Sequence, residues 1–412
     1  MKLTSWLAVA LCALGCGLAA PLLEELSPEA RYRAAAALGC LVVATLAYYE
    51  GERWLGQDSG EGEEGSKVPQ DLGEFIVREE EKSDTPGDID GYENVYDVKS
   101  GGFSRVKQVR RTTTKEVYAL KLTNIHRAFD EGQVSHTLNE KEILSSVDHP
   151  FIVKLYTTFK DTNYVYFLLE FVGGGELFDV IKKEKKLKVE AAKFYAANVI
   201  AALEYLHGKK IAFRDLKSEN LLLDRQGYLK VIDFGMSRFV HDKCHTFAGT
   251  LDYVSPELLS MDPYTEHVDW WALGCLVYEM LTGSTPFKGT EEERLEAMRA
   301  HSIRFEDDFD PVARDLVERL LHPKYSKRLG TGSNAGVQIR SHPWFKGFDW
   351  AALMKRQMDA PKFDSGMPKL SLITPKKLVT RSLSVRAAVE AEPPESPRTY
   401  SPTAIDTFFK GF

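Results

Sequence analysis

Two polar loops joined by a short apolar segment stand in the middle of the sequence. The first, FRDLKSEN, carries Asp215, Lys217 and Asn220, and the second, DFG, begins with Asp233. The intervening LLLDRQGYLKVI has the pattern of a tight β-hairpin, which folds Asn220 and Asp233 toward one another. An amide oxygen and a carboxylate are hard ligands that suit Mg²⁺, which keeps water and substrate phosphates in its other positions. The pattern therefore predicts a magnesium–phosphate site with Asp215 within reach of a substrate hydroxyl.

The sequence around these loops changes character at a glycine triplet, residues 173–175. Before the triplet, VKQVRRTTTKEVYALKL predicts a hairpin, and PFIVKLYTTFK and YVYFLLEFV predict two more strands. Between the hairpin and these two strands, SHTLNEKEILSSV predicts an amphipathic helix with Leu138, Ile143 and Val147 facing inward. After the triplet, VEAAKFYAANVIAALEYLHGKK and VDWWALGCLVYEMLTG predict long helices. We therefore expect an α+β fold with a small β-rich part, a larger helical part and a hinge near residues 172–175.

Composition narrows the class of protein. The 412 residues suffice for one large two-lobed domain with flanking segments, and the formal net charge of −7 argues against a nucleic-acid partner. The five cysteines have no paired spacing that suggests zinc or a disulfide framework. The body of the chain therefore has the composition of a protein from a reducing compartment.

Five motifs, in order, resemble those of the eukaryotic protein kinases. YALK supplies Lys121, HTLNEKEIL supplies Glu140, and FRDLKSEN, DFG and the SPE at residues 255–257 follow. The resemblance runs from residue 92 to residue 345 and implies the bilobal kinase fold, with an N-lobe at 92–172 and a C-lobe at 173–345. An active serine/threonine kinase is the function it implies. Lys217 in DLKSEN disfavours a tyrosine kinase, and the alternative is a membrane-tethered pseudokinase that acts as a scaffold.

The resemblance also implies a role for each polar residue in transfer of the ATP γ-phosphate, where catalysis is positioning plus charge stabilisation. Lys121 would hold the α and β phosphates, with Glu140 keeping its ammonium in place. Sequence separation alone would favour an exposed ion pair for these two residues, and the order of the motifs reverses that reading. Asp215 would orient the acceptor hydroxyl and take its proton, and Lys217 would neutralise the transferred phosphoryl. Asn220 and Asp233 would bind Mg²⁺.

The remaining nucleotide contacts implied by the resemblance come from the glycine-rich loop, from the hinge, and from residues above and below the adenine ring. The hinge backbone would hydrogen-bond the purine, and one leucine would lie beneath it. These positions are Val98, Gly101, Gly102, Phe103, Ser104, Val106, Ala119, Leu169, Glu170, Val172, Glu176 and Leu222.

Within the kinases, the motifs most resemble the AGC group and its cAMP-dependent members. Thr246 matches an activation-loop phosphorylation site, and a phosphate there could pair with Arg214, Arg238 and His136. A cyclic-nucleotide-binding regulatory subunit is an implied partner. Each match alone could be an unmodified threonine or a solvated side chain.

Three acidic positions, Glu176, Glu219 and Glu279, match those that receive basic residues of protein substrates in this group. Each alone could be a structural carboxylate, and the set of three favours basic Ser/Thr substrates.

Aromatic residues carry two further expectations. Phe213 replaces the usual histidine of the catalytic loop and is expected to stack on Phe234. The terminal Phe409 and Phe412 resemble an F-x-x-F motif that docks on the small lobe, although two aromatics at a tail end could also be incidental.

The sequence departs from the family pattern at several places. Ser218 replaces a proline of the catalytic loop, and Leu251 and Asp252 replace a Pro-Glu pair, which weakens the inference about substrates. The tail, residues 346–412, lacks a clear segment to cover the adenine. In the glycine-rich loop VKSGGFSRV, Lys99 and Ser104 take the places of two glycines.

The N-terminal region, residues 1–56, has no counterpart in the soluble family members. Its two apolar runs, Trp6–Ala20 and Ala34–Tyr49, resemble a signal or anchor segment and a membrane-associated segment. The second run has 16 residues, against about 20 for a comfortable span, so a surface-packing helix is the alternative. Arg31 and Arg33 favour a non-cytosolic body, but the need for ATP favours a cytosolic kinase domain. An acidic linker follows at 57–91.

The altered glycine-rich loop generates a testable prediction. Backbone N–H groups cradle phosphates, and serine keeps its N–H while losing access to positive φ. We expect Lys99→Gly combined with Ser104→Gly to tighten ATP binding, measured by calorimetric titration. Unchanged or weaker binding would contradict the idea that these two residues stiffen the loop.

Overall fold

The structure is a computed structural model that describes residues 89–100, 104–240, 249–332 and 334–363, together with positions 385, 405, 408, 409 and 412. The chain divides into two units, 1–80 and 81–412, and all described residues lie in the second. The N-terminal segment, the linker up to residue 88, Gly101, Gly102, Phe103 and Thr246 lie outside the described residues. Among the residues described, no helix is long and apolar enough to cross a membrane.

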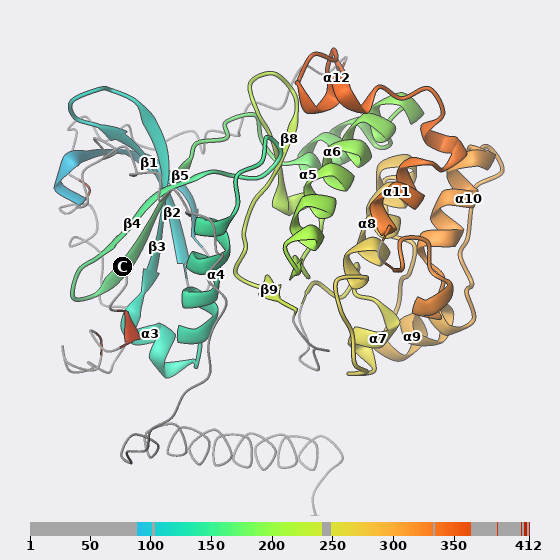
Figure 1. Cartoon of the computed structure of the whole chain (residues 1–412), viewed down its shortest axis with the longest axis horizontal. Coiled ribbons are helices and arrows are strands. Elements are labelled where there is room, and N and C mark those ends of the chain that lie inside the picture. Colours follow the sequence, from blue (N-terminus) through green and yellow to red (C-terminus); the bar gives the residue numbers. More distant parts are fainter. Residues whose placement is uncertain are drawn as a thin grey trace, which may run out of the picture. The chain divides into compact units, whose positions relative to one another are not determined.

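The N-lobe is an antiparallel sheet with the order β1-β2-β3-β5-β4 (Figure 1). After the short turn η1 (Ile89–Gly91), its strands are β1 (Tyr92–Ser100), β2 (Ser104–Arg111), β3 (Val117–Asn124), β4 (Leu155–Lys160) and β5 (Tyr164–Glu170), with helices α3 (Ile125–Asp130) and α4 (Val134–Ser146) inserted after β3. The predicted hairpin and helix are confirmed, and Ile143 and Val147 are buried while Leu138 is partly buried. The strand expected from residue 150 begins only at Leu155.

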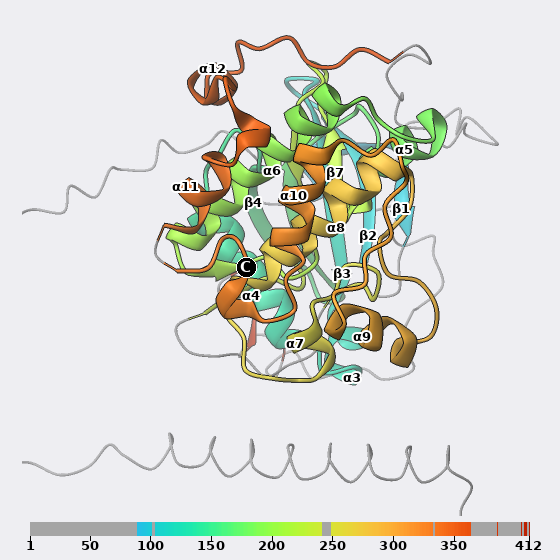
Figure 2. The same cartoon turned by 90° about the vertical axis from the view of Figure 1, so that its right-hand side faces the viewer.

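The C-lobe is helical and follows the glycine triplet (Figures 1 and 2). Its elements are α5 (Leu177–Glu184), α6 (Val189–Gly208), β6 (Ile211–Ala212), η2 (Ser218–Asn220), β7 (Leu221–Leu223), β8 (Leu229–Val231), β9 (Arg238–Phe239), α7 (Pro256–Leu259), α8 (Val268–Thr282), α9 (Glu291–Arg299), α10 (Pro311–Leu320), η3 (Tyr325–Lys327), α11 (Ala335–Arg340), η4 (Pro343–Phe345) and α12 (Trp350–Met354). Helices α6 and α8 are apolar on most sides and form the core of this lobe, as expected of buried helices. The predicted α+β arrangement with two lobes is confirmed.

Gly174 explains why the chain needs glycine where the lobes join. Its N–H donates to the carbonyl of Leu223 in β7 at 2.8 Å. A Cβ at position 174 would lie 2.3 Å from that carbonyl oxygen, so any other residue would push the linker away from β7.

The end of the chain packs against the small lobe, which confirms the expectation for the terminal aromatics. Phe409 is fully buried, with its ring centroid 6.0 Å from that of Phe129 in α3. The Phe412 ring lies 5.5 Å from Phe167 of β5, and the Lys141 ammonium lies 4.3 Å from its centroid. The tail therefore covers the side of the sheet next to α4 with aromatic surface.

A buried ion pair ties α7 to the rest of the C-lobe. Arg328, whose side chain is inaccessible to solvent, donates to both carboxylate oxygens of Glu257 at 2.6 and 2.9 Å. Burial raises the pKa of Glu257, but contacts from His267 and Arg328 outweigh it and lower the pKa to about 2. The negative charge of Glu257 is therefore stabilised in the folded chain.

Removing one member of this pair leaves an uncompensated buried charge. We expect Arg328→Met to lower the free energy of unfolding at pH 7 by about 3–5 kcal/mol, measured by urea denaturation. Adding Glu257→Gln should recover part of the loss because the buried charge is then gone. Equal stability of Arg328→Met and the parent chain would show that the pair contributes little.

Candidate active site

The two polar loops predicted to converge are brought together by the hairpin of β7 and β8. Leu221 pairs with Val231, and the Ile232 N–H donates to the Asn220 carbonyl at 3.0 Å. Asn220 and Asp233 therefore sit at the open end of the same hairpin, as the sequence predicted. The Phe213 and Phe234 rings pack edge to face at 5.2 Å, which confirms their expected contact.

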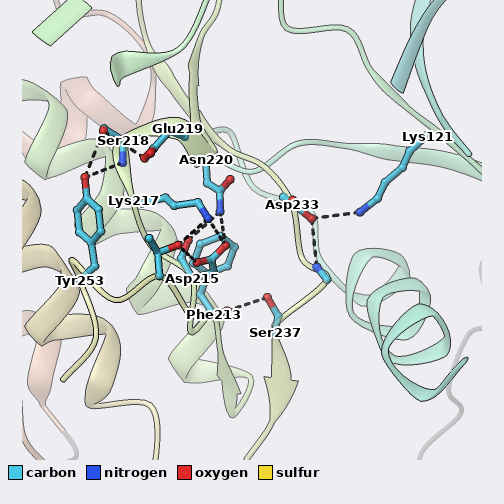
Figure 3. Close-up of polar contacts among 12 residues, drawn as sticks. Lys121, Phe213, Asp215, Lys217, Ser218, Glu219, Asn220, Asp233, Ser237 and Tyr253 are labelled. Carbon is cyan, nitrogen blue, oxygen red and sulfur yellow. Dashed lines mark hydrogen bonds and ion pairs between the residues drawn. The ribbon is translucent and has the colours of Figure 1, made fainter. Parts of the chain in front are cut away.

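Asp215 is held at both carboxylate oxygens (Figure 3). Lys217 Nζ and Asn220 Nδ2 donate to Oδ2 at 2.8 and 2.9 Å, and Thr250 Oγ1 donates to Oδ1 at 2.9 Å. Lys217 Nζ also donates to Thr250 Oγ1 at 2.8 Å. Because the Asn220 amide nitrogen is used on Asp215, its amide oxygen is the atom that can bind a metal. The result is a fixed, partly accessible carboxylate able to accept a proton from a hydroxyl.

Lys121 connects the sheet to this loop system. Its Nζ donates to Glu140 Oε1 of α4 at 2.6 Å and to Asp233 Oδ1 at 3.1 Å. Burial alone would lower the pKa of Lys121, but the carboxylates of Asp233 and Glu140 raise it, so the side chain is a permanent cation. The positive charge of Lys121 in turn lowers the pKa of Asp233. The Lys121–Glu140 pair, which sequence separation alone would have made an exposed contact, is therefore buried. Through Lys121 it is also linked to Asp233, so it joins both halves of the site.

Two residues of the site have an unusual backbone conformation. Asp233 and Arg214 have φ values of 64° and 68°, in the left-handed region that few non-glycine residues adopt. Each is held by neighbours: Asp233 contacts Lys121, and Arg214 Nε and Nη1 donate to the Met236 carbonyl at 2.6 Å and the Tyr264 hydroxyl at 2.8 Å. Strain of this kind persists only where the surroundings impose it, and it clusters at functional sites.

Side chains of helix α4 also contact backbone carbonyls of the segment after Asp233. The Asn139 amide donates to the Ser237 carbonyl, and His136 Nδ1 lies 3.3 Å from the Gly235 carbonyl. His136 and Arg214, two expected partners of a phosphate on Thr246, therefore already have contacts.

Two residues of the site were missed from the sequence. Asp269 of α8 is buried and accepts the Phe213 and Arg214 N–H groups at 2.8 Å each, and His207 Nε2 lies 2.8 Å from its Oδ2. Thr250 bridges Asp215 and Lys217, as described above. The only sequence signal for Asp269 was a charged residue within the apolar VDWWALGCLVYEML run, where an unpaired carboxylate would be costly.

The expected nucleotide-binding positions lie on the strands of the sheet and on the linker. In the register of the sheet, Val106 is opposite Lys121 and Ala119 is opposite Leu169, while Glu176 and Leu222 form an isolated bridge below the linker. Val172 is buried and Glu170 directs its carboxylate to Lys230 Nζ at 2.7 Å. Val98 and Ser104 lie on β1 and β2 beside the loop that is outside the described residues.

The three acidic positions differ in their surroundings. Glu176 and Glu219 are partly exposed, whereas Glu279 is buried on α8. Ser218 Oγ donates to Glu279 Oε1 at 3.1 Å, and the Tyr253 hydroxyl donates to Oε2. Asp252, which replaces a family glutamate, is paired with Arg294.

Comparison with known proteins agrees with this geometry. The family model described as "Protein kinase domain" matches residues 92–345. "cAMP-dependent protein kinase type 3" of Saccharomyces cerevisiae is 41% identical over 263 residues, which are 64% of this chain and 66% of the relative. A Caenorhabditis elegans protein named "cAMP-dependent protein kinase, catalytic subunit-like" is 39% identical over 270 residues, 65% and 68% of the two chains. The chain therefore belongs to the protein kinase family, and it is an ATP-dependent serine/threonine protein kinase.

Proposed function

We propose that this kinase uses Mg·ATP to phosphorylate serine and threonine residues in basic sequence contexts, in the manner of a cAMP-dependent kinase. The observation that carries the proposal is the set of contacts around Asp215 and Lys121. Three donors fix the Asp215 carboxylate, and the buried ammonium of Lys121 binds the Asp233 carboxylate, which lies with Asn220 at the open end of one hairpin. This arrangement suits in-line transfer of a phosphoryl group, where the protein mainly positions the reactants and balances charge.

The residues present fit a magnesium ion. Asn220 offers its amide oxygen and Asp233 a side chain about half exposed, and both are hard oxygen ligands. Magnesium is usually held by one or two protein ligands plus substrate phosphates, so a two-residue site is sufficient. The ion would neutralise phosphate charge, while Lys121 orients the phosphates, Asp215 accepts the hydroxyl proton and Lys217 stabilises the transferred group.

Preference for basic substrates rests on charge. Glu176, Glu219 and Glu279 present carboxylates near the catalytic loop, whereas Asp252 adds little because Arg294 neutralises it.

We also propose a cyclic-nucleotide-binding regulatory subunit as a partner, because related proteins are named catalytic subunits of cAMP-dependent kinases. The apolar runs within residues 1–56 support association of a cytosolic kinase domain with a membrane. No observation favours the pseudokinase alternative, since Lys121, Glu140, Asp215, Asn220 and Asp233 are all present and the described contacts join them.

The proposal predicts phosphate transfer from Mg·ATP to an arginine-rich serine peptide, measured with the full chain after phosphorylation of Thr246. Asp215→Asn should lower kcat by about 100- to 10,000-fold because the proton acceptor is lost. Asp233→Ala should abolish measurable transfer because it removes a metal ligand. Asp307→Asn, at an exposed position on the C-lobe surface, is the matched control and should leave kcat unchanged. ATP binding without transfer by the parent chain would favour the scaffold instead.

A further inference from the structure

Glu279 is a buried carboxylate beside the catalytic loop, and the groups that hydrogen-bond to it are hydroxyls rather than cations. Its neighbours are hydroxyl groups: Ser218 Oγ at 3.1 Å from Oε1, and the Tyr253 hydroxyl on Oε2. Within the described parts of the chain, no lysine or arginine forms an ion pair with it. A buried negative charge without a cation is costly, so a basic group brought by a substrate gains from binding there.

Ser218 closes a small hydrogen-bonded ring around this carboxylate (Figure 3 shows its contacts with Tyr253 and Glu219). Ser218 is fully buried, its Oγ lies 3.2 Å from the Tyr253 hydroxyl, and its N–H lies 3.4 Å from the same oxygen. It directly follows Lys217, which contacts Asp215, so the ring is covalently joined to the catalytic loop. A proline, the family residue at this position, offers neither the hydroxyl nor the N–H.

We propose that Ser218 is a specificity-determining residue: its hydroxyl holds Glu279 in the ionised form and so sets the pH range in which the kinase prefers a basic substrate. The inference rests on the proposed function, because it concerns the recognition of basic residues by that same site.

The groups around Glu279 set its pKa, and Ser218 is one of those that lower it. Burial raises the pKa of Glu279 to about 7, and the hydrogen bonds from Tyr253 and Ser218 oppose that rise. Glu219 of the catalytic loop and Asp252, next to Tyr253, both raise it further, although Asp252 is paired with Arg294. On α8 itself, Cys275 lies one turn earlier and is a buried neutral thiol whose pKa is raised, chiefly by burial. Deprotonation near neutral pH therefore creates the charge that attracts a substrate cation.

The test uses the full chain and a serine peptide rich in arginine, with a series in which each arginine in turn is replaced by uncharged citrulline. The readout is the ratio of kcat/KM for the arginine peptide to that for the citrulline peptide, between pH 6 and pH 8.5. Any effect of pH on ATP or on the chemical step is common to both peptides and cancels in the ratio, as does any loss of folded enzyme. At the arginine position that Glu279 recognises, the ratio for the parent chain should rise through about pH 7 and then level off.

In Ser218→Ala, the midpoint of that rise should move up by about one pH unit, because a hydrogen bond to the charged form is lost. The ratio at pH 7 should then fall about fivefold, as the ionised fraction drops from one half to about one eleventh. Ser218→Thr keeps a hydroxyl and should move the midpoint back toward the parent value. Tyr253→Phe removes the other donor and should shift the midpoint in the same direction as Ser218→Ala. Glu279→Gln should show a ratio that does not vary with pH.

The matched control is Ser237→Ala, which removes a buried hydroxyl bonded to the Phe213 carbonyl, away from Glu279, and should leave the midpoint in place. A midpoint unmoved in both Ser218→Ala and Tyr253→Phe overturns the inference while leaving the preference for basic substrates intact. A parent chain that phosphorylates all the peptides equally at every pH overturns both the inference and the proposed preference.

Discussion

The contacts of one ammonium group hold the active site together. Lys121 of β3 reaches Glu140 of α4 and Asp233 of the loop after β8, so a strand, a helix and a loop from both lobes meet at a single nitrogen atom. Placing charged groups in a buried position costs desolvation energy, and only close opposite charges offset it. The position of α4 and the strained backbone of Asp233 are therefore coupled: movement of α4 away from β3 would leave Lys121 with one carboxylate and weaken the restraint on Asp233.

A second buried charge fixes the other side of the site. Asp269 accepts two consecutive N–H groups of the catalytic loop, so the most apolar helix of the C-lobe serves as the base on which Asp215 is presented. Backbone N–H groups satisfy this carboxylate, and they hold the chain at Arg214 in its left-handed conformation. Rigid support of this kind suits a reaction in which catalysis depends on placing groups rather than on reactive side chains.

Much of the site follows from local sequence. The hairpin between Asn220 and Asp233 spans few residues and has clear turn chemistry, so their convergence was predictable, as was the helix that carries Glu140. The contact between Phe213 and Phe234 was expected only from the resemblance to the protein kinases. The strand expected at residues 150–160 began late because Phe151, Ile152 and Val153 are buried outside the five-stranded sheet, where Ile152 forms an isolated bridge with Val231 of β8. The role of Ser218 was visible only as a departure from a pattern, since its partners Tyr253 and Glu279 lie 35 and 61 positions away.

The sequence by itself determined the fold class, the order of the motifs and the identity of the polar groups, because periodicity and turn residues act over short stretches of chain. Only the tertiary structure decided which of those groups form ion pairs or hydrogen bonds with one another. It placed Lys121 between two carboxylates, gave Asp269 the catalytic loop as its partner, paired Asp252 with Arg294 and brought the hydroxyl groups of Ser218 and Tyr253 to Glu279. The physical reason is that ionisation and hydrogen bonding depend on distance and burial in three dimensions, which sequence separation does not encode.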